Sequence, residues 1–272
     1  MKKIKVGLAL GGGAARGMAH IGVLDVLEQE GVPIDMIAGT SFGGLVGALR
    51  AQGKDPGLMK EIALKINVMK MLSLADLTLP KSGLFGGKAV INLLHKIMGD
   101  DARFDELPIP LALVATDIIT GEEVVIDQGS VLDGVRATIS IPGIFTVAKW
   151  QDRYLVDGGL INPVPVSVLK KMGADFIIAV NVMPDLRDST RQVDKKQSRP
   201  KEPNIFNVLL QSLYISSHII SIASAEGADI TITPDTTHIH PGDFHRAREC
   251  IEVGEKAARE AVPEIKRRLS QT

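Results

Sequence analysis

The sequence predicts a three-layer α/β/α fold in which helices cover both faces of a mostly parallel central sheet. Short apolar runs alternate with segments of helical periodicity, and glycine-, aspartate- and proline-containing turns separate them. Two strand–turn–helix units open the chain, an order typical of parallel sheets whose strands are joined by crossover helices. The expected strands span residues 5–10, 36–39, 109–116, 122–127, 154–156, 175–182 and 229–233.

The first two units are the clearest elements of this pattern. Residues 5–10 form an apolar run that ends at Gly11, and residues 15–29 continue with apolar side chains at helical spacing. Residues 36–39 and 42–51 repeat the same order of strand and helix. We therefore expect two neighbouring parallel strands, each followed by a helix.

The C-terminal third contains two contrasting helices after a charged loop. Residues 184–203 carry many charges and almost no apolar side chains, which predicts a solvated loop. Residues 204–225 contain no Asp, Glu, Lys or Arg, and their apolar side chains recur at helical spacing. This helix is either buried in the domain or covered by a partner or lipid, and burial is the favoured interpretation. Residues 246–269 predict a charged amphipathic helix on the outside.

Length and composition limit the classes of function. The 272 residues are 45% hydrophobic and 23% charged, which predicts one soluble domain over 1–272. Its motif-bearing core covers about 5–182, and a helix–strand–helix segment at 204–270 completes it. The net charge of −1 provides no basic field, so we expect no nucleic-acid partner.

The cellular location is suggested by three weak signals. Lys2, Lys3 and Lys5 precede an apolar run, but that run is short and lacks a cleavage site, so we interpret it as a buried strand. The single cysteine, Cys250, excludes an intrachain disulfide and agrees with a reducing compartment. No run resembles a spanning helix of about 20 apolar residues. We expect a cytoplasmic protein that can associate peripherally with membranes.

The first chemical motif is Gly39-Thr40-Ser41-Phe42-Gly43, a G-x-S-x-G pattern between an expected strand and an expected helix. In that context the turn is sharp, the flanking residues must be small, and the serine stands at a helix N-terminus that stabilises negative charge. The pattern predicts Ser41 as a nucleophile. The alternative is a glycine-rich turn with a capping serine.

The second motif is the glycine-rich loop from Gly11 to Gly17, directly after the first strand. Such loops allow backbone amides to approach a phosphate or an oxyanion. The loop lacks the Lys-Ser/Thr of a P-loop, and no acidic residue ends the second strand, as a dinucleotide site would require. We therefore favour an oxyanion hole, with Gly12 and Gly13 as the expected amide donors. Arg16 either orders this loop or binds a phosphate head group.

The third motif is Asp157-Gly158-Gly159 after a short strand, which has little meaning by itself because such turns are common. Together with the first two motifs, and with the segment 140–143 before it, it resembles the patatin-like phospholipase family, in particular its bacterial branch. The resemblance covers residues 5 to about 182, and the three motifs occur in the family's order.

This resemblance implies a patatin-like fold and a serine hydrolase that cleaves carboxylic esters of lipids or phospholipids through an acyl-serine. Ser41 would be the nucleophile and Asp157 the base, without a catalytic histidine, a metal or a cofactor. The other motif residues would form the oxyanion hole or support the turns: Gly11, Gly12, Gly13 and Ala14 in the hole, and Arg16, Gly17, Gly39, Gly43, Gly158 and Gly159 as support.

A lipid substrate also requires an apolar acyl pocket, and the sequence contains a candidate wall or lid after the second helix. It either lines the pocket or simply packs in the core. Its residues are Val68, Met69, Met71, Leu72, Leu74, Leu77, Leu84 and Phe85. The expected partners are the acyl-ester substrate, a membrane surface and a second copy of the chain, since the uncharged helix 204–225 could form a dimer face.

Four other functions fit parts of the sequence. An α/β-hydrolase triad could use Ser41, Asp157 and either His238 or His240, although Ser41 follows only the second strand. The same histidines with His245 could bind zinc, but no H-E-x-x-H pattern supports this. An acyltransferase with a Ser–His pair, or a catalytically inactive scaffold, is also compatible with the fold class.

Overall fold

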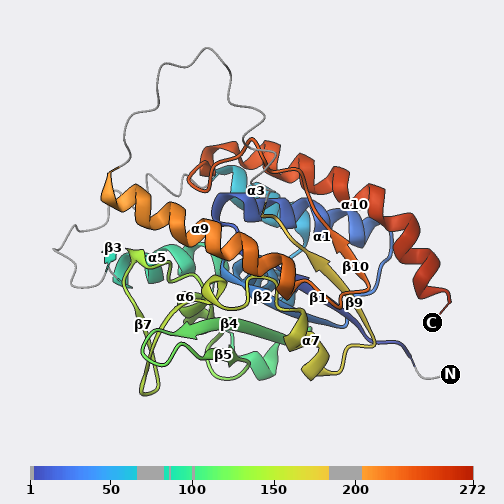
Figure 1. Cartoon of the computed structure of the whole chain (residues 1–272). Coiled ribbons are helices and arrows are strands. Elements are labelled where there is room, and N and C mark those ends of the chain that lie inside the picture. The colour runs from blue at the N-terminus through green and yellow to red at the C-terminus, as the bar shows by residue number, and fades with distance from the viewer. Residues whose placement is uncertain (1–2, 66–82, 86, 100–101, 184–203, 272) are drawn as a thin grey trace, which may run out of the picture.

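The computed structural model describes residues 3–65, 83–85, 87–99, 102–183 and 204–271. Within these residues, one central sheet has the strand order β10-β9-β1-β2-β4-β8-β7, and β5 pairs with β4. Helices cover both faces of this sheet (Figure 1). The strands are β1 (Val6–Leu10), β2 (Met36–Thr40), β4 (Leu111–Asp117), β5 (Glu123–Ile126), β7 (Ala148–Trp150), β8 (Arg153–Asp157), β9 (Phe176–Val180) and β10 (Ile230–Ile232).

The five strands from β10 to β4 are parallel, which confirms the predicted fold class. Their central members β1, β2, β4 and β9 are buried along their whole length, as expected for strands covered on both faces. Leu10 pairs with Gly39 of β2 and with Val180 of β9. The carboxyl ends of these strands therefore meet at one edge of the sheet.

The other edge of the sheet is antiparallel. β5 returns along β4 as a hairpin, and β8 pairs with β4 and β7 in antiparallel register. The short strand that the sequence predicts at 154–156 is thus the centre of β8. Asp157, the last residue of β8, pairs with Ala115 in the middle of the sheet.

The face of the sheet with the larger core carries most of the helices. They are α1 (Ala19–Gln29), α2 (Ser41–Ala51), α3 (Pro56–Lys65), α5 (Gly87–Met98), α6 (Val131–Thr138) and α10 (Ala247–Leu269). Val6, Leu8 and Leu10 of β1 face this core. α1 and α10 cross closely at two glycines that leave no room for a side chain. A Cβ atom on Gly22 would lie 2.1 Å from the Ile251 carbonyl oxygen, and one on Gly254 would lie 2.0 Å from the Ala19 carbonyl oxygen.

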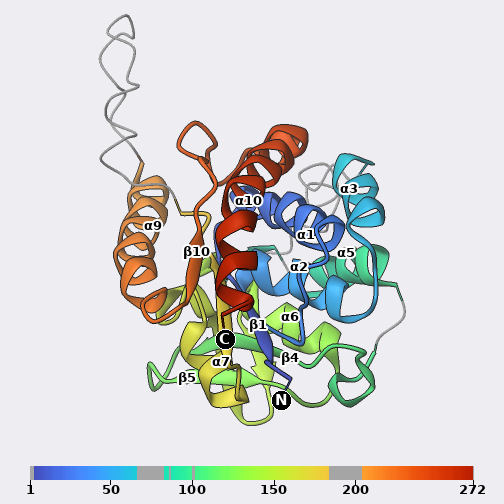
Figure 2. The same cartoon turned by 90° about the vertical axis from the view of Figure 1, so that its right-hand side faces the viewer.

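The opposite face is covered by α7 (Val166–Met172) and α9 (Ile205–Ser224). A smaller core joins α7 to the alternate side chains of the strands, among them Ala9 and Ala38. Figure 2 shows α9 on one flank of the molecule and α1, α3 and α5 on the other. The arrangement is the predicted three-layer sandwich.

Two of the predicted helices differ from the structure. The helix expected at 15–29 is divided into a 3-10 helix, Ala14–Met18, followed by α1, because the glycine loop first makes a tight turn in which the Arg16 amide bonds to the Gly13 carbonyl. The favoured burial of the uncharged helix is wrong for one of its faces. Ile205, Leu209 and Ile219 of α9 are 73%, 58% and 63% exposed.

Two further expectations concern segments that bear on membranes. The loop predicted at 184–203 lies outside the described residues. Among the described helices, none combines the length and the apolar character needed to cross a bilayer.

Candidate active site

Ser41 occupies a strained turn between β2 and α2. Its φ of 55° lies in the left-handed region, which is uncommon for a residue with a side chain and is a feature of nucleophile elbows. The neighbouring glycines leave no room for side chains: a Cβ atom on Gly39 would lie 2.5 Å from the Gly44 Cα, and one on Gly43 would lie 2.4 Å from the Leu10 carbonyl oxygen. Gly39 and Gly43 therefore allow the close packing of this turn, the role that the sequence pattern predicts for them.

Thr138, the last residue of α6, fixes the backbone of Ser41. Its Oγ1 accepts a hydrogen bond of 2.8 Å from the Ser41 amide and donates one to the Val114 carbonyl of β4. Ser41 itself is only 5% exposed. The backbone amide of Ser41 is thus hydrogen-bonded to Thr138, so the side-chain hydroxyl is not required to hold the turn.

Asp157 lies directly opposite that hydroxyl. Ser41 Oγ donates a hydrogen bond of 2.5 Å to Asp157 Oδ2, and the Gly159 amide donates one of 2.7 Å to Asp157 Oδ1. Gly158 is required for the close approach to β4, since a Cβ atom there would lie 2.3 Å from the Val114 carbonyl oxygen. The structure therefore brings together the serine and the aspartate of the first and third motifs.

Burial makes Asp157 a stronger base than an ordinary aspartate. Asp157 is 6% exposed, and this burial raises the pKa of its carboxyl from 3.8 to about 6, although the hydrogen bonds from Ser41 and Gly159 lower it in part. Tyr214 of α9 and Asp157 line one pocket next to Ser41. Burial raises the pKa of the Tyr214 phenol to about 12, and the charge of Asp157 makes a smaller contribution in the same direction. Tyr214 is consequently neutral at physiological pH.

The glycine loop differs in detail from the expectation. The Gly11 amide donates to the Val180 carbonyl at 3.0 Å, and the Gly12 amide donates to the Pro163 carbonyl at 2.9 Å. Both amides are engaged with the backbone, so the assignment of Gly11 and Gly12 as oxyanion donors was wrong. Gly13 and Ala14 remain as amide donors, and both line the pocket beside Ser41.

Three contacts hold this loop in place. The His20 ring Nε2 lies 2.7 Å from the Gly11 carbonyl oxygen inside the core, and burial lowers the pKa of His20 to about 4. A neutral His20 that donates from Nε2 satisfies this carbonyl. Arg16 Nε donates to the Ile239 carbonyl at 2.7 Å, and the Ala15 amide donates to the Pro241 carbonyl at 3.1 Å. Arg16 thus orders the loop, the first of its two predicted roles.

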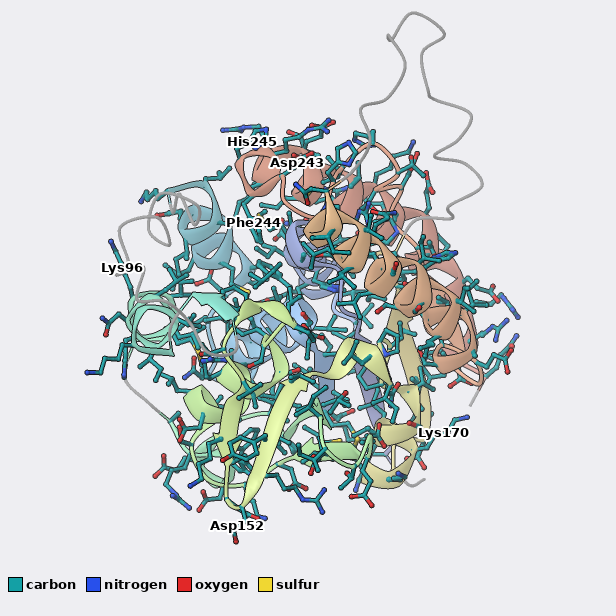
Figure 3. All side chains as sticks on the ribbon, turned by 60° about the vertical axis from the view of Figure 1, so that its left-hand side comes forward. Lys96, Asp152, Lys170, Asp243, Phe244 and His245 are labelled. Atoms are coloured by element: carbon teal, nitrogen blue, oxygen red, sulfur yellow. The ribbon has the colours of Figure 1, made fainter. Side chains whose placement is uncertain are left out.

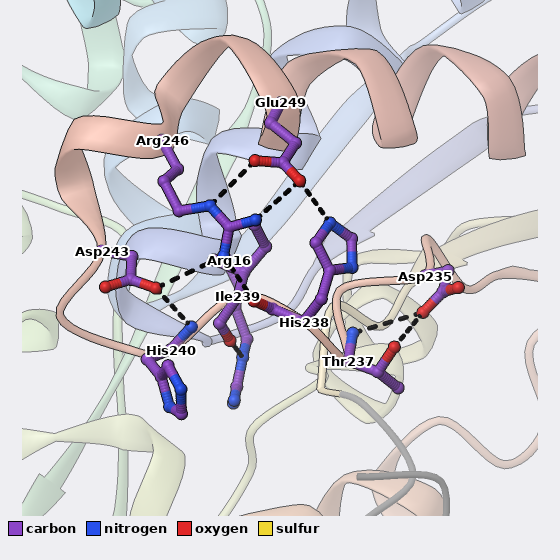
Figure 4. A network of polar contacts seen from close by, with 9 residues as sticks. All are labelled: Arg16, Asp235, Thr237, His238, Ile239, His240, Asp243, Arg246 and Glu249. Atoms are coloured by element: carbon purple, nitrogen blue, oxygen red, sulfur yellow. Dashed lines mark hydrogen bonds and ion pairs between the residues drawn. The ribbon is translucent and has the colours of Figure 1, made fainter. Parts of the chain in front are cut away.

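The segment that receives Arg16 is itself tied to α10 by a charged network (Figure 4). Glu249 accepts hydrogen bonds of 2.7 and 2.8 Å from Arg246 and lies 2.8 Å from the His238 ring. Asp243 caps the turn by accepting from the His240 amide at 2.9 Å. His238 and His240 thus take part in contacts that hold this segment against α10.

The histidine-based alternatives find no support among the described residues. No histidine lines either of the two pockets at Ser41, and His238 contacts Glu249 rather than Asp157. Within the described part of the chain, no group of three or more His, Cys, Asp and Glu side chains is arranged to hold a metal ion.

Comparison with known proteins agrees with this geometry. A model of the family described as patatin-like phospholipase matches residues 8–170, more than half of the chain. The chain belongs to the patatin-like phospholipase family. The matched span contains the glycine loop, the serine turn and the Asp-Gly-Gly turn, so each candidate site residue lies in the shared part.

Relatives of this patatin-like chain occur in bacteria and animals. An uncharacterised NTE family protein of Mycobacterium tuberculosis is 33% identical over 224 residues, which cover 81% of this chain and 59% of that protein. Patatin-like phospholipase domain-containing protein 6 of Homo sapiens is 36% identical over 182 residues, which cover 65% of this chain and 13% of the relative. This chain therefore spans less than two thirds of the length of these curated relatives.

A solved structure shows the same fold. VipD from Legionella pneumophila superposes with a TM-score of 0.53 at 13% identity, over 97% of this chain and 67% of that one. At this identity, the likeness shows a shared fold alone.

Two pockets of the patatin-like domain meet at Ser41. The first is almost wholly apolar and runs between α1, α2, α3 and α5, with Leu45, Val46 and Leu49 of α2 along one wall. Phe42 and Phe244, whose ring centroids lie 6.1 Å apart, also line it. In Figure 3 the Phe244 side chain lies on the inner side of its segment, whereas labelled charged residues such as Lys96 and Asp152 lie at the periphery. We call this first pocket the acyl arm.

The second pocket lies on the other side of the dyad and is bounded by α9. Leu210, Leu213, Tyr214 and Ser217 of this helix line it together with Asp157. Asp157 is the one charged side chain in its described lining. We call this pocket the second arm.

The predicted wall after the second helix is only partly described. Its residues from Val68 to Leu77 lie outside the described part of the chain. Leu84 and Phe85 belong to β3 (Gly83–Phe85), which pairs in parallel with β6 (Gly143–Phe145). Among the described residues, helices α3 and α5 line the acyl arm, and we did not predict these helices as its walls.

Sequence reasoning missed three residues that shape the site. Thr138 and His20 act through backbone contacts with residues 97 and 9 positions away, which a local pattern does not reveal. Tyr214 did give a signal, because it is the one tyrosine in the uncharged helix. A polar ring in such a helix indicates a buried contact.

Proposed function

We propose that this chain is a serine esterase that cleaves acyl esters of lipids by a Ser41–Asp157 dyad. The observation that carries the proposal is the 2.5 Å hydrogen bond from Ser41 Oγ to Asp157 Oδ2 at the junction of an apolar pocket and a glycine loop. A serine hydroxyl requires a base within hydrogen-bond reach, and Asp157, with a pKa near 6, is mostly ionised at neutral pH.

In the first step, Ser41 Oγ attacks the ester carbonyl carbon while its proton passes to Asp157. The carbonyl oxygen becomes an oxyanion, which the amides of Gly13 and Ala14 would bind and which the N-terminus of α2 would stabilise electrostatically; the position of both residues on the pocket supports this role. Collapse of this intermediate breaks the ester C–O bond. Asp157 returns the proton to the departing alcohol, and an acyl-serine remains.

In the second step, water replaces the alcohol. Asp157 takes a proton from the water, whose oxygen attacks the acyl carbon, and the proton is then delivered to Ser41 Oγ as the acid leaves. Each step uses one base and one oxyanion site, so the cycle returns the enzyme to its starting state without a metal or cofactor.

A lipid substrate is supported by the acyl arm. Its apolar lining begins at Ser41 and continues along α2, which suits a hydrocarbon chain attached to the attacked carbonyl. The leaving alcohol would occupy the second arm, and the described lining of that arm contains no cationic side chain that could bind an anionic head group close to the ester. We also place the enzyme in a reducing compartment such as the cytoplasm, supported by its single, buried cysteine.

The proposal is tested with p-nitrophenyl esters of graded chain length. We expect Ser41→Ala and Asp157→Asn each to lower kcat/KM by at least about 10³-fold, because each removes an indispensable member of one catalytic unit. His238→Ala and His240→Ala serve as matched controls and should retain most of the activity, since neither histidine lines the arms.

Two outcomes would contradict the dyad. If Ser41→Ala hydrolyses the esters at the wild-type rate, Ser41 is only a turn residue. If activity is lost in a histidine variant but kept in Asp157→Asn, a serine–histidine mechanism replaces the one proposed.

A further inference from the structure

Helix α9 has an apolar face that no described part of the chain covers. Its 20 residues include no Asp, Glu, Lys or Arg. By helical geometry its exposed apolar side chains lie on one side of the helix and form a stripe, which the exposed Ser212 and Ser216 interrupt. The exposed apolar members are Ile205, Val208, Leu209, Ile215, Ile219 and Ile222, each between 41% and 73% exposed. Isolated exposed hydrophobic residues are ordinary, but six of them on one side of a helix indicate a contact surface.

The opposite face of the same helix borders the candidate active site. Leu213, Tyr214 and Ser217 line the second arm next to Asp157. Near its C-terminal end, α9 is fastened to the domain because Ser221 Oγ accepts a hydrogen bond from Asn181 at 3.2 Å and Ser224 Oγ accepts one from the Val164 amide at 3.1 Å. One helix therefore separates the pocket from the exposed stripe.

We infer that the outward face of α9 docks on the surface of a lipid bilayer, with the helix lying in the plane of the membrane. This inference rests on the proposed function, because an esterase of membrane lipids must take its substrate from a lipid phase. A helix of 20 residues is about 30 Å long, so the stripe can lie along the boundary between head groups and acyl chains. Docking there brings the second arm next to the bilayer.

The chemistry of the stripe favours a lipid surface over a second copy of the chain. The energetic anchors of protein interfaces are mainly Trp, Tyr and Arg, and the exposed apolar members of the stripe are all Ile, Val or Leu. A stable interface also buries about 800 Å² on each partner with some 20 to 30 residues, more than one helix face offers. A bilayer requires only apolar area, and the position of the stripe beside the second arm gives lipid contact a use.

The absence of charge on α9 defines which membrane it suits. Peripheral helices rich in Lys and Arg bind anionic lipids and are released by salt. α9 carries neither residue, so its binding should depend on apolar contact alone. We expect attachment to vesicles of pure phosphatidylcholine, with little change between low and high salt.

The test is flotation of the full chain with phosphatidylcholine vesicles, in a Ser41→Ala background so that no lipid is hydrolysed. We expect the Ser41→Ala protein to float and the added pair Ile215→Ser and Ile219→Ser to lower the bound fraction about tenfold. The matched control is the pair Leu58→Ser and Leu64→Ser on α3, each 42% exposed and on the opposite flank (Figure 2). This control should float like its parent.

Folding and dimerisation are separated from membrane binding by two further measurements. Ile219→Trp should float at least as well as the parent, because Trp favours the membrane interface. This variant tests the same surface without a serine substitution that could disturb the fold. Light scattering should show a monomer whose mass is unchanged by the serine pair. The inference is overturned if the parent does not float, if both serine pairs float equally, or if the parent is a dimer that the α9 pair dissociates. Flotation requires no catalysis. The flotation result can therefore be interpreted even if the proposed Ser41–Asp157 dyad proves wrong.

Discussion

The ionisation of Asp157 is the residue-scale feature on which both the proposed chemistry and the stability depend. The carboxyl is buried beside an apolar arm, and within the described part of the chain it receives two hydrogen bonds, from Ser41 and Gly159. Its raised pKa means that the folded state holds the carboxylate at a cost in free energy. Active-site groups are commonly kept in such an unfavourable state because function requires it.

The stability cost has a definite sign and pH window. Well below pH 3.8 the carboxyl is neutral in the folded and the unfolded chain, so no cost arises. Between about pH 4 and 6 the unfolded chain ionises first, and the free energy of unfolding falls by about 3 kcal/mol as pH rises to neutrality. We expect Asp157→Asn to be more stable than the wild type by up to about 3 kcal/mol at pH 8, and by little at pH 4.

Urea unfolding of both proteins at the two pH values measures this difference. The titration of His20 affects both proteins alike and cancels in the comparison. A variant that is no more stable than the wild type at pH 8 would show that burial does not destabilise this carboxylate.

The sequence predicted that Ser41 and Asp157 belong to one site, and the structure places them in hydrogen-bond contact, but the sequence could not predict the state of every amide of the glycine loop. Ser41 and Asp157 stand in local patterns whose turn geometry depends on neighbouring glycines. The state of the Gly12 amide depends on the Pro163 carbonyl, which is brought in by a distant part of the chain. Such a contact follows from the fold and has no local signature.

At the scale of the elements, α2 combines two tasks. It starts at the candidate nucleophile, and its residues Leu45 and Leu49 line the acyl arm at intervals of one turn. A helix rises about 1.5 Å per residue, so Leu49 lies about 12 Å beyond Ser41 along the axis. With C–C bonds of about 1.5 Å in a zigzag chain, about ten carbons cover this length.

The dimensions of the arm predict a chain-length profile. We expect kcat/KM for p-nitrophenyl esters to rise from acetyl to about decanoyl and then to level off or fall. Leu45→Phe fills the arm one turn below Ser41 and should lower the ratio of decanoyl to butyryl activity about tenfold. The butyryl ester is the internal control. A profile that Leu45→Phe leaves unchanged would mean that the acyl chain lies elsewhere.

Element prediction succeeded where the pattern was local and failed where the environment decides. The apolar spacing of residues 204–225 gave a helix, and α9 spans Ile205–Ser224. The apolar spacing did not predict which side of this helix faces the second arm and which is exposed, because both sides are apolar. The helices α3 and α5 were not predicted as pocket walls, because their sequences contain no motif that indicates a position near Ser41.

At the scale of the whole molecule, the site is assembled from strands that lie apart in the sequence. Ser41 follows β2 and Asp157 ends β8, and these two strands flank β4. The alternation of strands and helices was enough to predict the layers, since parallel strands require crossover helices. We propose that the chain forms one domain, supported by a hydrophobic core that runs from Val6 of β1 to Ile265 of α10. The antiparallel edge that positions Asp157 could not be predicted from a strand of five residues.

The most direct test of the dyad is covalent labelling of the intact protein with an alkyl fluorophosphonate, followed by mass spectrometry. We predict one phosphonyl adduct on the peptide that contains Ser41, none in Ser41→Ala, and very slow labelling of Asp157→Asn. The labelling rate of the wild type should rise with pH through about 6, as the Asp157 carboxylate forms. An adduct on another residue, or equally fast labelling of Asp157→Asn, would contradict the proposed roles of Ser41 and Asp157.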